Sequence, residues 1–147
     1  MATGTFKFYG KSMISVWNKE IDFNTDVIKG MHTSSSYTPD QDVHDYKDDV
    51  TNEVTGTNVP AGGFTADNCT LTYTGATNVF KLDHDDESIS TATATGIAST
   101  VWYDSSPATD ATRPLIGYVT WDSALSPNAG TLAFNLDSAG LATITVS

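Results

Sequence analysis

Two acidic clusters hold the side chains best suited to chemistry in this 147-residue chain. The first is the run Asp-His-Asp-Asp-Glu at residues 83–87, and its carboxylates are the ligand type that calcium prefers. The run lacks the glycine and the alternating spacing of a calcium-binding loop. Because such like-charge runs are usually solvated, we interpret residues 83–88 as an acidic hairpin loop and predict no metal.

The second cluster consists of five aspartates and His44 between residues 40 and 49. Paired carboxylates act as acid and base when they face each other in a buried cleft. One predicted helix carries all of these aspartates, so no second set faces them across a groove. We interpret the cluster as a solvated helix face or a contact with a basic partner. Hydrolysis of a cell-wall polymer, tested at Asp45 and Asp85, is the least favoured alternative.

The other reactive residue types are not arranged as a known site. His32, His44 and His84 do not have metal-ligand spacing, and the single cysteine, Cys69, has no base near it in the sequence. We interpret Cys69 as a structural thiol. The sequence shows no phosphate-binding loop and no nucleophile motif. It therefore predicts no enzyme activity and no cofactor.

The net charge of −11, from 18 acidic and 7 basic residues, limits the possible partners. It repels phosphate backbones and anionic lipids, so we expect no nucleic-acid and no membrane binding. The first residues lack a signal-peptide pattern and no apolar run reaches membrane-spanning length. We therefore expect synthesis in a cytosol without export. The charge favours solubility or a partner with a basic face.

Aromatic residues are concentrated near the N-terminus, and we predict that residues 1–30 form an arm and a first strand. Phe6 and Phe8 alternate with a lysine as in a strand, and with Tyr9 they should dock on their own domain or on a neighbour. Residues 11–18 have apolar side chains at helical spacing, which predicts a short helix with a buried side. Their β-branched residues leave a strand possible.

The clearest helix start is Thr38, followed by Pro39 and Gln41 where a first helical turn and a capping box need them. Tyr46 and three valines follow at near-helical spacing and would form an apolar stripe. These signals predict a helix from Thr38 to about Asp49. Residues 31–60 would then be a helix-containing insert.

From residue 61 onward the pattern has a period of two, which predicts short antiparallel strands. Residues 70–73 and 80–82 form one predicted hairpin, and residues 115–121 a strand buried on both faces. The most secure local prediction is a hairpin that pairs residues 132–136 with 142–146. The expected fold is mainly β, an antiparallel β-sandwich or barrel with a short helix and an N-terminal arm. We expect one domain over residues 1–147, with residues 61–147 as its sheet body.

Several short segments follow one another in a distinctive order. They are residues 18–26, 36–46, 52–57, 61–63, 114–119 and 137–140. In this order the chain resembles a family of small virion structural proteins of tailed bacteriophages. Proteins of this family are described as head decoration, head fibre or minor tail proteins.

The resemblance implies a capsid decoration, or cement, protein that binds the outside of a phage head and stabilises it. The implied partners are the major capsid protein and further copies of the chain, with a trimer fitting capsid symmetry. It would be made in the host bacterial cytoplasm and reside on the capsid surface of the virion. The residues expected to contact partners are Phe6, Phe8, Tyr9, Trp17, Phe23, Tyr37, Asp40, Asp42 and Tyr46.

The alternative function is a head-fibre or tail module that binds a receptor or a glycan. In that case Trp102, Trp121 and the loops at residues 83–88 and 104–114 would form the binding surface, because aromatic rings stack on sugars. Labelling of intact virions separates the two functions, since a decoration protein covers the head and a tail module does not.

Overall fold

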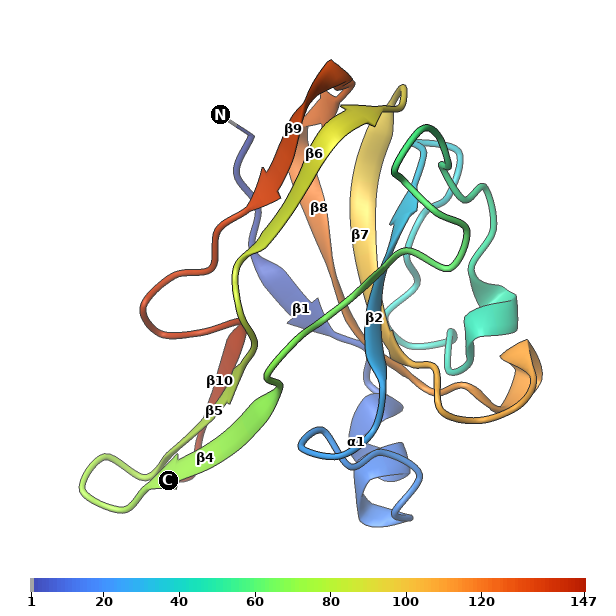
Figure 1. Cartoon of the computed structure of the whole chain (residues 1–147). Helices are drawn as coiled ribbons and strands as arrows, with labels where there is room; N and C mark the ends of the chain where they lie inside the picture. Colours follow the sequence, from blue (N-terminus) through green and yellow to red (C-terminus); the bar gives the residue numbers. More distant parts are fainter. Residues whose placement is uncertain (1) are drawn as a thin grey trace.

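The computed structural model describes residues 2–147, and its fold is mainly β with antiparallel sheets and one short α-helix (Figure 1). The strands are β1 (Phe6–Phe8), β2 (Ile28–Thr33), β3 (Phe64–Thr65), β4 (Thr70–Thr74), β5 (Val79–Asp83), β6 (Glu87–Thr93), β7 (Ile97–Asp104), β8 (Leu115–Leu125), β9 (Asn128–Phe134) and β10 (Ala142–Thr145). The helices are α1 (Ser12–Trp17) and two single 3₁₀ turns, η1 (Lys47–Asp49) and η2 (Asp110–Thr112). These assignments confirm the predicted fold class. No helix within residues 2–147 is long and apolar enough to cross a membrane.

The largest sheet has the strand order β1-β8-β7-β2-β3. Its central strand β7 is buried over most of its length, and the N-terminal half of β8 is covered on both faces as predicted, whereas the C-terminal half of β8 is largely accessible. The N-terminal strand β1 pairs with β8, with Phe6 opposite Val119. The aromatic N-terminus therefore docks on its own body.

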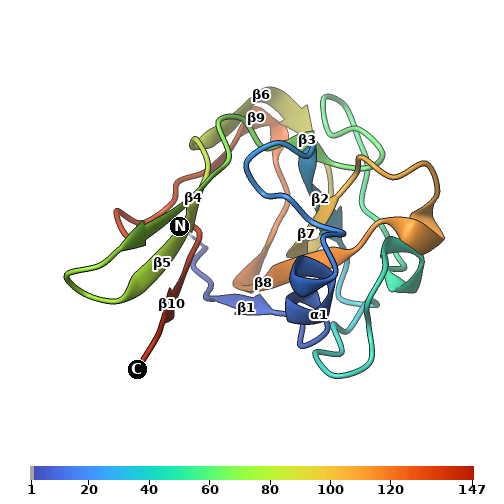
Figure 2. The same cartoon turned by 90° about the horizontal axis from the view of Figure 1, so that it is seen from below.

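A two-stranded ribbon, β6–β9, lies over one face of the large sheet and gives the molecule a sandwich-like arrangement (Figure 2). Phe134 of β9 packs between the two layers and contacts aromatic side chains of the large sheet. Its ring centroid lies 5.1 Å from His32 in β2, 5.6 Å from Phe64 in β3 and 5.5 Å from Trp121 in β8. Aromatic contacts of this kind add to the hydrophobic stabilisation of the core.

A third sheet, β10-β5-β4, projects from this body (Figures 1 and 2). The predicted hairpin of β4 and β5 is confirmed, with Tyr73 opposite Phe80. On its other side β5 pairs with β10, which places Ile144 opposite Phe80. Only Leu82 of the apolar side chains on β4 and β5 is buried, because the outer part of this sheet has no second layer.

The predicted C-terminal hairpin is wrong. Its turn forms, since the Gly140 N–H donates to the Asp137 C=O at 2.8 Å and Gly140 has a φ of +83°. However, β9 pairs with β6 and β10 pairs with β5, so the two strands enter different sheets. Phe134 of β9 instead packs in the aromatic core, against His32, Phe64 and Trp121.

The predicted helix from Thr38 to Asp49 is also wrong, since only the 3₁₀ turn η1 forms there. The Asp40 C=O accepts one bond, from the His44 N–H, which makes a single turn. After it, the Asp45 C=O accepts the Leu115 N–H at 2.8 Å and the Lys47 N–H donates to the Arg113 C=O at 2.9 Å. These backbone groups bond to the start of β8, so they are not available to a helix.

Candidate docking surface

The helix α1 packs against the body with its polar side, which is the opposite of the usual arrangement. Ser12 and Ser15 are 1% and 5% exposed. The Ser12 hydroxyl donates to the Tyr9 C=O at 2.7 Å, and the Ser15 C=O accepts the Glu20 N–H at 2.8 Å. The two serines, one turn apart, thus lie on the covered side of α1, and the other side of the helix faces outward.

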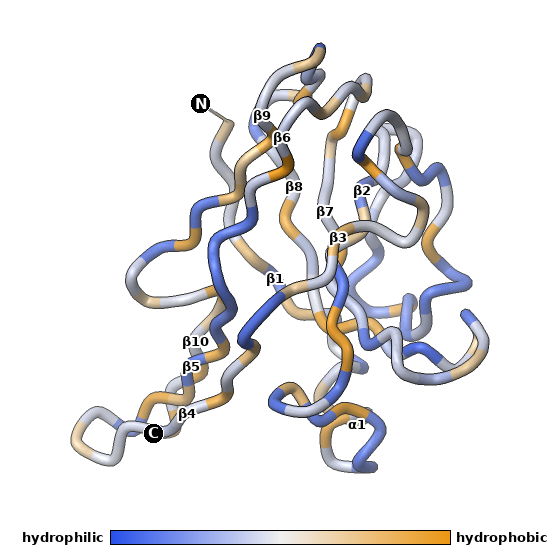
Figure 3. Tube along the Cα trace, in the orientation of Figure 1, coloured by the Kyte–Doolittle hydropathy of each residue, from blue (hydrophilic) through white to orange (hydrophobic). Residues whose placement is uncertain are grey.

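The outward side of α1 is apolar, and we call Ile14, Val16 and Trp17 the α1 face. Their exposed fractions are 60%, 42% and 86%, which makes Trp17 the most exposed large apolar side chain among residues 2–147. Figure 3 shows hydrophobic residues on α1 at the lower edge of the molecule as well as in the central strands. The predicted helix is therefore confirmed, but its predicted buried side is wrong.

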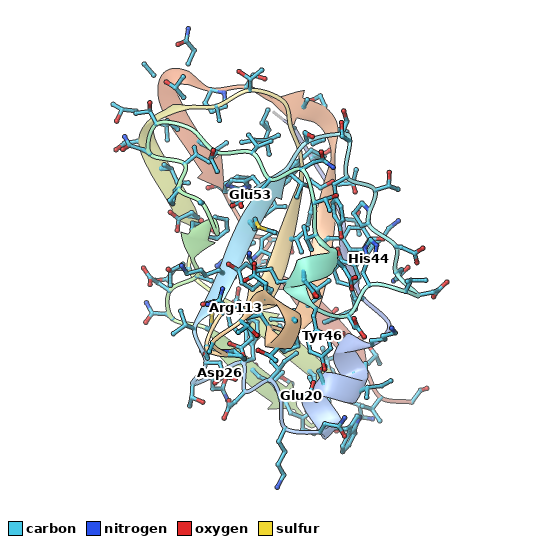
Figure 4. All side chains as sticks on the ribbon, turned by 90° about the vertical axis from the view of Figure 1, so that its right-hand side faces the viewer. Glu20, Asp26, His44, Tyr46, Glu53 and Arg113 are labelled. Carbon is cyan, nitrogen blue, oxygen red and sulfur yellow. The ribbon has the colours of Figure 1, made fainter. Side chains whose placement is uncertain are left out.

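Contacts on both flanks hold α1 in place. The Lys11 ammonium donates to the Val43 C=O at 2.8 Å and lies 3.1 Å from an Asp45 carboxylate oxygen. After the helix, Glu20 accepts the Tyr46 hydroxyl at 3.4 Å, and Figure 4 shows these two side chains beside α1. The α1 face is thus presented by a fixed helix, with the segment 43–46 along one flank.

A chain of aromatic side chains fixes that flank to the core. The Tyr9 and Tyr37 hydroxyls lie 2.9 Å apart, and the Tyr37 hydroxyl lies 3.0 Å from His44 Nδ1. His44 Nδ1 also accepts the Asp40 N–H, so Tyr37 must donate to it. Burial raises the pKa of Tyr9 and raises that of Tyr37 to about 12, which keeps both hydroxyls protonated. The row of side chains Tyr9, Tyr37 and His44 therefore positions the segment 43–46. Its two tyrosines offer no ionised group for catalysis.

Asp40 caps the turn that begins this segment, and its replacement gives a testable difference from its neighbour Asp42. The Asp40 carboxylate accepts the N–H groups of Asp42 and Val43 at 3.0 and 3.1 Å. We expect Asp40→Ala to lower the free energy of unfolding by about 1 kcal/mol, the usual value of such a cap. Asp42→Ala should leave it within about 0.5 kcal/mol, as is usual for surface positions. Urea unfolding of both variants measures this, and equal losses would contradict the assigned role of Asp40.

The structure separates the nine residues that we expected to contact partners. Tyr9, Phe23 and Tyr37 are buried, and Phe6 and Phe8 are partly buried against the core, where Phe6 contacts Trp102. In the single chain, three of these five side chains are covered and two are partly covered, so they add little to an exposed surface and their contact with a partner stays a prediction.

The other four expected residues lie at the surface. Trp17, Asp40 and Asp42 are exposed and Tyr46 is half-buried. Ile14 and Val16 belong to the same surface, although their helical spacing with other apolar residues predicts a buried position. The serines at positions 12 and 15 were the signal for the true orientation, since they mark a polar face at helical spacing.

The acidic run at residues 83–87 is anchored by a buried histidine. His84 Nε2 accepts the Trp102 indole N–H at 3.1 Å, and its Nδ1 donates to the Asp85 C=O at 2.7 Å. Burial lowers the pKa of His84, which suits the neutral ring that these bonds require. Within residues 2–147 no three His, Cys, Asp or Glu side chains form a group that could hold a metal ion.

A groove of about 520 Å³ lies between β1, β8, β9 and the segment 135–141. Trp102 and Trp121 border it, but Trp102 is 1% exposed and Trp121 donates its indole N–H to Thr100 Oγ1 at 3.2 Å. Asp137 is the one ionisable side chain in its lining. Because the Trp102 ring is covered, it cannot stack on a glycan. The predicted glycan-binding surface therefore cannot include Trp102.

Cys69 is half-buried and its thiol donates to the Ala66 C=O at 3.4 Å. Burial raises the pKa of Cys69 to about 11, so the thiol is protonated at neutral pH. The sequence-based interpretation of a structural thiol agrees with this position.

Comparison with known protein families, with curated proteins and with solved structures found no significant match to this chain.

Proposed function

We propose that this protein is a virion structural protein that decorates the head of a tailed bacteriophage and docks on the major capsid protein through the α1 face. The order of short segments that resembles phage virion proteins supports the phage head as the place of action. The α1 face supports docking as the mode of action. The two supports are independent, because one rests on sequence and the other on the exposure of side chains.

The observation that carries the docking function is the 86% exposure of Trp17 on a fixed helix. A tryptophan buries about 150–250 Å² when it is covered, and tryptophan is among the residues that contribute most to interfaces. Leaving it in water costs free energy that docking recovers. Since Lys11 and Glu20 hold both ends of α1, little conformational entropy is lost when the face is covered.

The charge around the α1 face describes the expected partner. The segments that flank α1 carry Glu20, Asp42 and Asp45 together with Lys11 and Lys19, of which Lys11 pairs with Asp45, and the whole chain carries −11. The matching capsid surface would have an apolar hollow for Trp17 with basic residues around it. Many copies on one shell make a modest affinity per copy sufficient, because each copy bridges neighbouring subunits.

The direct test adds purified protein to phage heads that lack it. We expect saturable binding to the heads, a higher melting temperature of the decorated heads, and weaker binding at high salt because the charges are screened. Isolated tails are the matched control surface. Binding to tails but not to heads would favour the fibre or tail function, and binding to neither would contradict docking on a virion.

A further inference from the structure

The projecting sheet leaves the edge of β4 without a partner strand in the described chain, and the Leu71 N–H is the backbone donor on it that the Asn24 side chain already binds. Within residues 2–147 no strand lies beyond β4 in the order β10-β5-β4, and all five residues of β4 are exposed. Exposed strand edges are usually protected by charged residues, proline or a bulge. Residues 70–74, Thr-Leu-Thr-Tyr-Thr, contain no charge and no proline, and their pairing with β5 runs without a bulge.

The backbone groups of Tyr73 point away from β5. Leu71 donates its N–H to the Asn24 side chain at 2.6 Å, so the backbone of Leu71 faces outward. In an antiparallel ladder the direction alternates along the strand, and Tyr73 therefore faces the same way as Leu71. The side chains of both residues are also accessible, with exposed fractions of 39% and 52%.

Charge identifies what can cover this edge. Residues 70–80 and β10 contain no charged side chain, and the charged side chains of the three strands are Lys81 and Asp83, which form an ion pair at 2.8 Å. The sheet is thus neutral, whereas the rest of the chain carries the whole net charge of −11. Two copies that meet elsewhere tend to bring carboxylates together, whereas contact at this sheet brings no net charge into the interface and leaves only the longer-range repulsion between the two bodies.

We propose that a second copy of this chain covers the edge, with β4 pairing antiparallel to β4 about a two-fold axis at Tyr73. Tyr73 of one copy then lies opposite Tyr73 of the other, and the two three-stranded sheets become one six-stranded sheet. Within one copy, the ring centroids of Tyr73 and Phe80 lie 4.7 Å apart. In the dimer the two Tyr73 rings meet, so the Tyr73–Phe80 pairs of both copies form one continuous apolar strip across the sheet.

The shape of the molecule permits this dimer. The β4–β5 hairpin points away from the body (Figures 1 and 2). Antiparallel pairing therefore places the two bodies at opposite ends of the joined sheet. Because Asn24 already holds the Leu71 N–H, the new backbone bonds centre on Tyr73. The interface is therefore small for a stable dimer, and the association should be weak and concentration-dependent. The proposal does not depend on docking to a capsid, because α1 is free in the dimer.

The test compares charge variants at the two-fold axis. Tyr73→Lys and Tyr73→Glu should each weaken dimerisation at least about tenfold, because like charges then face each other. Mixing the two variants should restore a dimer. Val43→Lys, at a position that is 60% exposed outside the sheet, is the control and should dimerise like the wild type.

Sedimentation velocity over micromolar to millimolar concentrations measures these equilibria, and circular dichroism checks that each variant folds. The wild-type dimer should strengthen with salt, because salt screens the repulsion between the two acidic bodies. A monomer at every concentration, a trimer, or a mixture of the two variants that fails to dimerise would overturn the proposal. None of these measurements uses phage heads, so this result and that of the head-binding test are independent.

Discussion

Replacing Trp17 by alanine is expected to weaken binding to phage heads on the order of 100-fold, while the free energy of unfolding stays nearly unchanged. Central aromatic residues of interfaces contribute about 2–4 kcal/mol, which corresponds to a factor of this size. The stability of the isolated protein should not fall, because 86% of the Trp17 side chain is already in solvent. Titration of heads with labelled protein gives the affinity, and thermal unfolding gives the stability.

A matched control uses another exposed apolar residue. Val146 is 50% exposed and directly follows β10 of the projecting sheet, which β1 separates from α1 in Figure 2. Val146→Ala should bind heads like the wild type. Equal losses for the two variants would mean that general surface hydrophobicity, and not the α1 face, causes binding.

Acid should destabilise the protein through His32, which is 1% exposed. Its Nδ1 lies 3.1 Å from Thr100 Oγ1, and the same oxygen accepts the Trp121 indole N–H. His32 Nε2 is buried and has no hydrogen-bond partner. Burial therefore disfavours the charged ring and lowers the pKa of His32 to about 4.

The sign of the effect follows from the two pKa values of His32. The unfolded chain binds the proton with a pKa of about 6.5, and the folded chain binds it only near 4. The unfolded state thus binds more protons between these values, and stability falls as the pH falls from 6.5 through 4. At about 1.4 kcal/mol per pH unit the loss should approach about 3 kcal/mol.

Urea unfolding at several pH values measures this loss, with His32→Phe as the test variant. The variant places an apolar ring, which does not titrate, between Phe64 and Phe134. The free energy of unfolding of His32→Phe should therefore not fall in this way between pH 6.5 and 4. Phe134→Leu is the packing control, which should lower stability by a similar amount at each pH. If His32→Phe loses stability toward pH 4 as steeply as the wild type, His32 does not cause the acid sensitivity.

The strand pattern could be predicted where alternation and local turns decide the structure. The β4–β5 hairpin is an example, because a short turn joins two strands that pair with each other. The C-terminal segment has equally clear alternation, yet β9 and β10 separate into different sheets. Period-two patterns show which residues are strands, but strand partners depend on packing far away in the sequence.

Helix signals failed in two instructive ways. Thr38 and Pro39 provide a good start, but the backbone of residues 45 and 47 bonds to β8 and stops the helix from continuing. In α1 the helix forms, but Ser12 and Ser15 occupy the body side and turn Trp17 outward. Hydrophobicity alone predicts a buried Trp17. Its surface position could be predicted only from the spacing of Ser12 and Ser15, which marks the polar side of the helix.

The central claim is that the α1 face is covered when the protein is on the virion. Oxidative footprinting followed by mass spectrometry measures the reactivity of Trp17 in free protein and on intact virions, with the covered Trp102 as an internal reference. We expect Trp17 to react strongly in the free protein and at least about tenfold more slowly on virions, as a side chain at the centre of an interface should. Equal reactivity of Trp17 in both states would contradict docking through α1.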